Sequence, residues 1–258
     1  MGKRLIRACG AQERANAAPL FANWDETLIG TSLQGRMGSV WQLSATAAVC
    51  LCGDFVFAAA GEGEEKALLE AVRAHLSGRF AILASRDDGL LMRVPEVFGR
   101  AACAQTRYAF DKHTAFDRNH LGQLARSILP GVRLVAFDDS ICRMAAQQEW
   151  SRDFCSQFEG AEDYLRRGVG VAALYAEQLV GGASSYICYD GGIEIELDTH
   201  RDWRGRGIAT ACAARLILTC LDRGLYPSWD AASLTSVHIA QRLGYGPGHP
   251  YPVWHLNE

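Results

Sequence analysis

The segment from Ile193 to Thr210 constrains the fold of this chain most, because an alternating strand runs directly into a glycine-rich turn that opens a helix. Side chains alternate between the two faces of a β-strand, so this strand has one apolar face and one acidic face. The apolar face consists of Ile193, Ile195, Leu197 and Thr199, and the acidic face consists of Glu194, Glu196 and Asp198. The pattern predicts a half-buried strand that presents acids on its second face.

The turn after this strand has the composition of a phosphate-binding junction. Gly205 and Gly207 let the backbone turn and approach a ligand without a Cβ in the way. Apolar residues recur at helical spacing from Ile208, so the free N–H groups of the first helical turn point back toward the glycines. A pyrophosphate is expected there, favoured by the helix dipole and by Arg204 and Arg206. The alternative is a tight turn with solvated arginines.

Two other phosphate loops do not fit the pattern. A dinucleotide-binding loop requires a third glycine three residues after the second, and here that position is Thr210. A Walker loop requires Gly-Lys-Ser or Gly-Lys-Thr, which this turn lacks.

The junction resembles the acyl-CoA loop of the GNAT N-acetyltransferase superfamily. The family pattern Arg/Gln-x-x-Gly-x-Gly/Ala is met by Arg204, Gly207 and Ala209. Downstream, residues 233–236 lead to Arg242-Leu-Gly-Tyr245, which is similar to the later helix and closing turn of that family. The run from Ala211 to Ala231 looks like a subfamily that includes the zwittermicin-resistance acetyltransferases.

The resemblance implies that acetyl-CoA is the acyl donor and that the junction binds it. Backbone N–H groups near Leu197 and Thr199 are then expected to stabilise the oxyanion of the tetrahedral intermediate. Ser233 stands where the family often has an asparagine that contacts the pantetheine arm. The expected acetyl-CoA contacts are Leu197, Thr199, Arg204, Gly205, Arg206, Gly207, Ile208, Ala209, Thr210, Ser233 and Ser236.

The acidic face supplies the candidates for catalysis. An alkylammonium has a pKa of about 10.4, so an amine acceptor must lose a proton before it attacks a thioester. In the family an acid on this strand commonly acts as the base, so the resemblance implies that role for Glu194 or Glu196. The residues do not decide between them. The alternative is that both are solvated acids or ion-pair partners of Arg201 and Arg204.

The proton donor to the CoA thiolate is not assigned. Many GNAT enzymes use a tyrosine four residues before the closing glycine, which is Gly244 here, but Ala240 stands at that position. Ser233, Ser236 and His238 are nearby, although helical serines are more often caps or surface groups. Trp229 and Asp230 are candidate substrate-binding residues, with Asp230 attracting a cationic amine. A core indole and an N-cap aspartate are the alternative.

Length and element order predict two lobes and a mixed α/β (α+β) fold. The 258 residues suit an N-terminal α/β domain at 1–130, a degenerate GNAT-like lobe without the phosphate loop, and a GNAT domain at 131–258. The second lobe should contain one strand, helices, three consecutive strands, and then helix, strand, helix and strand around a mixed central sheet. In the first lobe, strands are expected near residues 39–52, 55–60, 80–84 and 106–110, with a helix at 61–76 and a turn at 86–89.

Composition limits the partners. The net charge of −3 gives no broad attraction for nucleic acid or an anionic membrane, and the longest apolar stretch is too short to span a bilayer. The nine cysteines lack metal-ligand spacing and are expected to be reduced core thiols in a cytoplasmic protein without a metal. The first lobe is expected to wall the acceptor pocket or to form a homodimer contact.

The leading prediction is therefore an enzyme that acetylates a primary amine of a small molecule by direct attack in a ternary complex. A non-catalytic acyl-CoA sensor is the second reading, since Ala240 replaces the tyrosine. Acetylation of a protein N-terminus or of aminoacyl-tRNA is the third.

Overall fold

The structure is a computed structural model that describes residues 4–257. The chain divides into two compact units. Unit 1 contains residues up to Arg107 together with the segment from Tyr251, and unit 2 runs from Tyr108 to Pro250. The predicted boundary between residues 130 and 131 lies inside unit 2. Helix α5 (Arg118–Arg126) precedes that boundary, yet its Leu121 and Leu124 belong to the core of unit 2.

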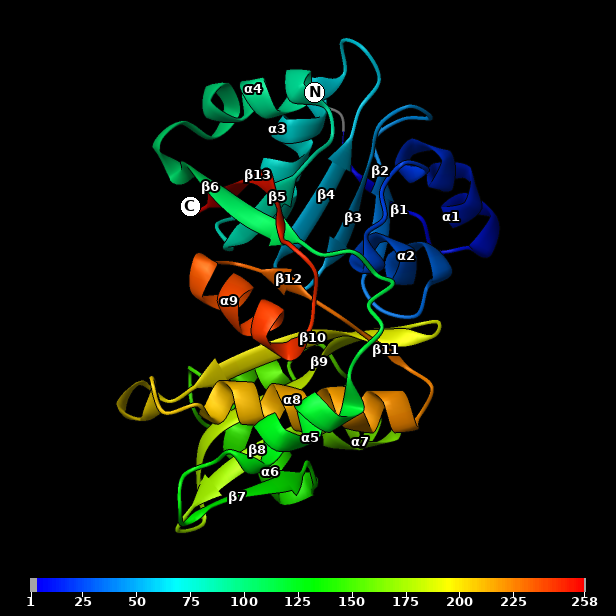
Figure 1. Ribbon diagram of the computed structural model, residues 1–258. Helices are drawn as coiled ribbons and strands as arrows, with labels where there is room; N and C mark the ends of the chain where they lie inside the picture. Colours follow the sequence, from blue (N-terminus) through cyan, green and yellow to red (C-terminus); the bar gives the residue numbers. More distant parts are fainter. Residues whose placement is uncertain (1–3, 258) are drawn as a thin grey trace. The chain divides into compact units, whose positions relative to one another are not determined.

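Unit 1 is a mixed sheet with helices (Figure 1). Its strands lie in the order β1 (Ile6–Arg7), β2 (Ser39–Gln42), β3 (Ala48–Cys52), β4 (Phe55–Ala59), β5 (Ala81–Ala84), β13 (His249–Leu256) and β6 (Ala102–Ala109). Its helices are α1 (Ala11–Ala17), α2 (Thr27–Gln34), α3 (Glu65–Leu76) and α4 (Asp88–Phe98). Leucines and valines of α3 and α4 share one core with β3, β4 and β5, whose inward residues include Val49, Val56 and Leu83.

Helix α4 was not expected from the sequence, which suggested a turn at residues 86–89. The helix begins where the Asp87 carboxylate accepts hydrogen bonds from the Gly89 and Leu90 N–H groups. Pro95 lies inside it and lacks an N–H, so it removes one helical hydrogen bond. The buried Leu90, Val94 and Phe98 provide the packing that offsets this loss.

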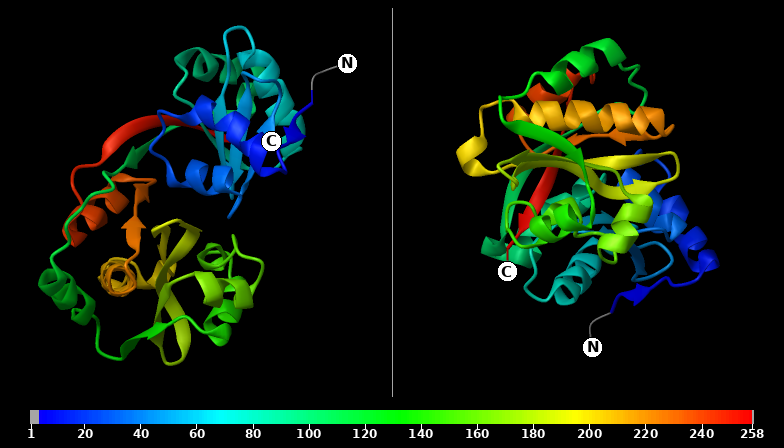
Figure 2. Two further views of the ribbon diagram at one scale, coloured as in Figure 1. Left: turned by 90° about the vertical axis from the view of Figure 1, so that its right-hand side faces the viewer. Right: turned by 90° about the horizontal axis from the view of Figure 1, so that it is seen from below.

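Unit 2 contains a five-stranded sheet in the order β11–β10–β9–β8–β7. Its bounds are β7 (Val132–Ala136), β8 (Gly170–Tyr175), β9 (Gln178–Tyr189), β10 (Gly192–Thr199) and β11 (Tyr226–Ser228). Helices α5 and α8 (Ile208–Asp222) cover one face, whereas α6 (Asp139–Ala146) and α7 (Ala161–Arg167) cover the other (Figure 2). This is the mixed α/β architecture predicted, with strand β10 and the start of α8 at the predicted residues.

The last part of unit 2 contains β12 (Asp230–Ala231) and α9 (Leu234–Leu243). Strand β12 pairs antiparallel with the end of β6, which enters unit 2 at Tyr108 and Ala109. Within residues 4–257, no helix is both long and apolar enough to cross a lipid bilayer.

Candidate active site

The candidate site is at the place where two neighbouring strands of unit 2 part. Strand β10 pairs with β9 along its whole length, from Gly192↔Tyr189 to Thr199↔Gly181. Its parallel ladder with β11 contains, in the described residues, three pairs and ends at Glu194↔Ser228. Beyond Glu194, β10 continues to Thr199 while the chain after Ser228 leaves it. The sheet therefore opens along this edge of β10.

The two faces of β10 have the predicted characters. Ile193 is fully buried in the core of unit 2, and Ile195 and Leu197 pack against that core. Glu194 and Glu196 lie on the opposite face. Glu194 is only 6% exposed, whereas Glu196 is partly exposed. The burial of Glu194 was not expected, and it makes this carboxylate the one more strongly removed from water.

A hydrogen-bonded hydroxyl pair lies on the strands that neighbour Glu194. Ser228, its partner in the ladder, is 1% exposed, and its Oγ lies 2.7 Å from the Tyr189 hydroxyl. The Tyr189 hydroxyl also donates to the Tyr226 carbonyl at 3.4 Å. Sequence reasoning missed Ser228 and Tyr189. Their signal is cross-strand register, which places them on the face of Glu194 but requires the strand order to be known.

Tyr245 closes the inner side of this region. Its hydroxyl donates to the Pro227 carbonyl at 2.5 Å, and its ring lies 5.5 Å from the Trp229 ring. Burial raises the pKa of Tyr245 well above its ordinary value, and the nearby Tyr226 and Glu194 charges raise it further. Tyr245 therefore stays protonated and fixes the end of β11.

A β-bulge lies beside the opening. The register between β9 and β10 shifts between Glu194 and Ile195, so β9 contributes one additional residue, Tyr186. A bulge bends the strand and increases its local twist. The bulge here lies at the same level of β10 as the last pair with β11, Glu194↔Ser228.

The glycine turn has the conformation expected of a phosphate loop. Gly205 and Gly207 have φ of +73° and +79°, a left-handed backbone that other residues adopt at a cost. A Cβ built on either glycine has no neighbouring atom within 4 Å, so the space beside both is open. The glycines are thus required by the backbone conformation, and the protein does not fill the space in front of them.

Helix α8 begins at this turn without a side-chain cap. Its N-cap is Gly207, and the first helical hydrogen bond runs from the Ala211 N–H to the Gly207 carbonyl at 3.0 Å. The preceding N–H groups, those of Ile208, Ala209 and Thr210, have no acceptor within the helix. Together with the helix dipole they form a site for an anion.

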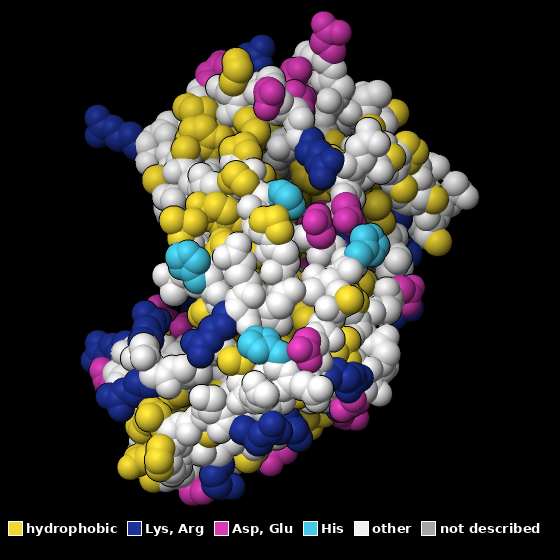
Figure 3. Space-filling view, viewed as in Figure 1, with side chains coloured by type: hydrophobic (Ala, Val, Ile, Leu, Met, Phe, Trp, Pro, Cys, Tyr) yellow, Lys and Arg dark blue, Asp and Glu magenta, His cyan; other side chains and the backbone are white. Residues whose placement is uncertain are grey.

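The three arginines of the loop have different partners. Arg204 donates from Nε to the Thr199 carbonyl at 3.0 Å and from Nη2 to Asp198 Oδ1 at 3.3 Å, so it ties the loop to the end of β10. Arg206 lies over the Trp203 ring at 5.1 Å. Arg201 is largely exposed beside Asp202. Figure 3 shows basic side chains gathered where this loop precedes α8.

Helix α9 uses its predicted site residues for its own structure. The Ser233 Oγ caps the helix by accepting from the Ser236 N–H at 3.3 Å, and the Trp229 indole donates to the Ser236 Oγ at 3.1 Å. Trp229 is 6% exposed and Ala240 is fully buried in the same core. Asp230 is in β12 and is not the helix cap. The ligand-binding roles of Ser233, Ser236, Trp229 and Asp230 therefore remain predictions.

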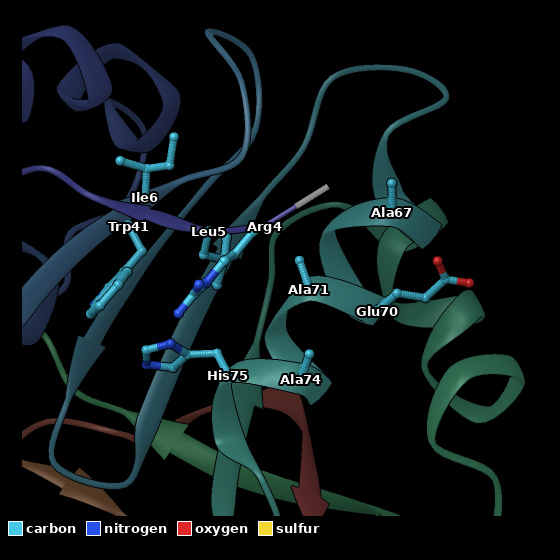
Figure 4. A pocket seen from close by; sticks show the side chains of 9 residues that line it. All are labelled: Arg4, Leu5, Ile6, Trp41, Ala67, Glu70, Ala71, Ala74 and His75. Atoms are coloured by element: carbon cyan, nitrogen blue, oxygen red, sulfur yellow. The ribbon is translucent and has the colours of Figure 1, made fainter. Parts of the chain in front are cut away.

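Unit 1 has a separate pocket of about 890 Å³ beside α3. Figure 4 shows the Arg4, Trp41 and His75 side chains together, with alanines of α3 on the other wall and Glu70 directed away. The Trp41 and His75 rings are 4.3 Å apart. Burial, then the charges of Arg79 and Arg4, lowers the pKa of His75, so this imidazole is neutral at pH 7. None of the predicted site residues lines this pocket.

Comparison with known proteins places the chain among acetyltransferases. A family model described as GNAT acetyltransferase matches residues 18–254. A GCN5-related N-acetyltransferase-like protein from Streptococcus suis is 37% identical, with a TM-score of 0.89 over 96% of this chain and 100% of that one.

Two more distant relatives add less. The uncharacterized N-acetyltransferase YdfB of Bacillus subtilis is 26% identical over 100 residues, which cover 38% of each chain. A tandem GNAT protein from the clavulanic acid biosynthesis pathway is 13% identical, with a TM-score of 0.59 over 98% of this chain and 97% of its own, and shows a shared fold.

Proposed function

The chain belongs to the GNAT acetyltransferase family of acyltransferases, and from this premise we propose that it transfers an acetyl group from acetyl-CoA to a primary amine of a small molecule. The observation that carries the proposal is the junction of β10 and α8. There, two left-handed glycines and an uncapped helix start lie at the end of a strand that carries two carboxylates and faces an opening in the sheet.

The junction fits the donor substrate. The N–H groups of the first turn of α8 are proposed to bind the CoA diphosphate, with Arg206 contributing charge and Arg204 holding the loop in shape. The open space beside Gly205 and Gly207 admits a ligand against the backbone. Main-chain groups of β10 near Leu197 and Thr199, on the edge that β11 leaves, are proposed to align the thioester and stabilise the oxyanion.

The carboxylates of β10 are proposed to prepare the acceptor. The amine must lose a proton to attack, and a well-placed base contributes roughly 10²- to 10⁴-fold to the rate. Glu194 is buried, whereas Glu196 is nearer to solvent, so the two differ in how readily they exchange protons with water. We propose that one of them removes the proton, directly or through water, and that the other attracts the cationic acceptor.

The acceptor is proposed to be a small cationic amine of the antibiotic or amino-acid type, as the zwittermicin-resistance resemblance suggests. The two acids of β10, beside the edge that β11 leaves, attract such a molecule, and the net charge of −3 disfavours a nucleic acid. The amine is proposed to attack the thioester directly in a ternary complex.

One observation favours a sensor as the second candidate. Ala240, at the position of the family tyrosine, is fully buried in the core, so that position offers neither a proton donor nor space for one. An acyl-CoA sensor needs the junction but not the acid, and it would bind acetyl-CoA without turnover.

The test is to incubate the protein with acetyl-CoA and a panel of small amines while the release of free thiol is followed. Thiol release that requires an amine, and that falls in Glu194→Gln or Glu196→Gln at unchanged acetyl-CoA affinity, supports the enzyme. Saturable binding of acetyl-CoA without turnover of any amine in the panel supports the sensor. Absence of binding by calorimetry contradicts both.

A further inference from the structure

Two cysteines that the proposed reaction does not use lie in contact in unit 2. Cys142 is in the middle of α6, and Cys155 directly follows the short 3₁₀ helix Arg152–Phe154. Their sulfur atoms are 3.7 Å apart, and the Cys155 thiol donates a weak hydrogen bond to the Cys142 sulfur. A disulfide has an S–S length of about 2.05 Å, so the sulfurs must approach by roughly 1.7 Å to be joined.

The environment of this pair differs from that of the other buried thiols. The hydrogen bond from Cys155 lowers the pKa of Cys142 against the opposing effect of burial. Burial raises the pKa of Cys212 and of Cys220 to about 12. Cys155 is partly exposed, which connects the pair to solvent. A cysteine of lowered pKa next to a second thiol is the arrangement in which an oxidised cysteine is resolved as a disulfide.

We propose that Cys142 and Cys155 are a reversible oxidation site that forms an intrachain disulfide with hydroperoxides. The Cys142 thiolate attacks a peroxide oxygen, which breaks the O–O bond and gives a sulfenic acid and hydroxide when the oxidant is hydrogen peroxide. The Cys155 thiol then attacks the sulfenic sulfur, the S–O bond breaks, and water leaves. Two electrons pass from the thiols to the peroxide, and the balance is two thiols and one peroxide to one disulfide and two waters.

The disulfide closes a loop that lies against the segment before the glycine turn. Within the loop, the Trp150 ring lies 5.7 Å from the ring of His200, the residue that follows Thr199. The end of the loop is attached to β9, because the Ser184 hydroxyl donates to the Phe154 carbonyl at 2.8 Å. A crosslink reduces the range of conformations that this loop can adopt, and so it holds Trp150 against His200. This inference does not depend on the proposed acetyl transfer.

The test is peptide mapping of the full chain with Cys9 and Cys103, the two exposed cysteines, replaced by serine. After brief treatment with hydrogen peroxide and alkylation of remaining thiols, trypsin releases Leu134–Arg143 and Asp153–Arg166, each with one cysteine. The expected result is one linked species, lighter than the sum of the two peptides by two hydrogens, which dithiothreitol separates. Recovery of both peptides alkylated, or of Cys142 as sulfonic acid without the linked species, overturns the proposal.

Matched variants locate the effect. Cys142→Ser and Cys155→Ser should each abolish the linked species, whereas Cys212→Ser should retain it. Brief trypsin treatment of the folded protein provides a second measurement, because the exposed Arg143 and Arg152 lie within the loop between the two cysteines. Oxidation should slow cleavage at these two sites several-fold, and equal rates before and after oxidation contradict the restraint on the loop.

Discussion

Units 1 and 2 each contain a central strand that pairs antiparallel on one side, pairs parallel on the other, and is followed by a glycine turn and a helix. In unit 1 this strand is β4, which pairs with β3 and β5 and leads to α3. In unit 2 it is β10, which pairs with β9 and β11 and leads to α8. Gly63 and Gly207 precede their helices with nearly the same φ, +80° and +79°.

The side chains at these two turns carry opposite charge. The unit 1 turn reads Gly61-Glu-Gly-Glu-Glu65, whereas the unit 2 turn reads Arg204-Gly-Arg-Gly207. In unit 1 the Glu64 carboxylate accepts hydrogen bonds from the Ser44 and Thr46 hydroxyls, so an internal anion stands at the start of α3. That unit 1 is a degenerate GNAT-like lobe stays a prediction. The two turns also show that the same backbone conformation before a helix suits an anion in both units. The charge of the neighbouring side chains decides whether that anion is an internal carboxylate, as in unit 1, or a ligand, as proposed for unit 2.

The largest effect is expected on turnover, where the two central strands differ most. β10 carries Glu194 and Glu196, whereas β4 is apolar throughout. Glutamine at the base position should lower kcat by roughly 10²- to 10⁴-fold and leave the Kd for acetyl-CoA within about twofold. Steady-state kinetics and calorimetry measure both quantities. Glu62→Gln in unit 1 is the control, and normal kcat in both β10 variants would contradict a carboxylate base.

The next largest effect is expected for the glycine turns themselves. Gly207→Asp places a carboxylate where the diphosphate is proposed to bind and should weaken acetyl-CoA binding by at least about 100-fold. Gly63→Asp is the matched control, because it adds the same side chain at the same φ into open space in unit 1. Both variants carry a similar backbone strain of about 1–2 kcal/mol, so equal losses of affinity would show that strain, not the ligand contact, is responsible.

A smaller effect is expected for the loop arginines. Arg206→Ala should weaken acetyl-CoA binding by about five- to tenfold at low salt, and the loss should shrink as salt increases, because an exposed charge is screened. Arg204→Ala should weaken binding through disorder of the loop, since Arg204 contacts Thr199 and Asp198. Calorimetry at two salt concentrations distinguishes them. Lys66→Ala, at the start of α3, is the control and should change nothing.

The smallest effect is expected on stability. The hydrogen bonds that Arg167 donates to Asp163 are the main reason why the pKa of Asp163 is well below its ordinary range. Hydrogen bonds from the Glu159 N–H and from Arg166 lower this pKa further. A lowered carboxyl pKa adds stability that is present above about pH 4 and is lost as the pH falls through the folded-state pKa. Asp163→Asn should therefore cost about 1 kcal/mol at pH 7 and less at pH 3 in urea unfolding.

The exposed ion pair of Lys66 and Glu96 in unit 1 provides the contrast to Asp163. Both side chains of this pair are about half exposed, so water screens it. Glu96→Gln should leave the urea midpoint unchanged at both pH values. A loss of stability as large as that of Asp163→Asn would contradict the expectation that the exposed ion pair of unit 1 contributes less than the buried one of unit 2.

Local signals in the sequence predicted the parts of the fold that depend on neighbouring residues. The strand at 192–199 and the helix start at Ile208 are confirmed, because alternation and the glycine turn are contained in the segment itself. The closing strand that the element order predicts after the last helix is present as β13, from His249 to Leu256. What the sequence did not show is that this strand pairs with β5, since pairing between distant segments has no local signature.

The same limit applies to the candidate site. The acidic face of β10 was predictable, but the burial of Glu194 was not, because Ser228, its partner in the ladder with β11, comes from a distant segment of the chain. Trp229 and Ala240 both belong to the core of unit 2. The periodicity of a short segment cannot distinguish a tryptophan in the core from a tryptophan that lines a pocket.

Strand β13 has a consequence for how the protein is made. Unit 1 takes its strand from Tyr251–Leu256, between β5 and β6, while the rest of this unit precedes residue 108. During synthesis the sheet of residues 4–107 therefore stays incomplete until unit 2 and the following strand β13 have emerged from the ribosome. Chaperone dependence and aggregation of nascent chains are expected to concentrate in that interval, and removal of a few carboxy-terminal residues should damage the unit farthest from them in sequence.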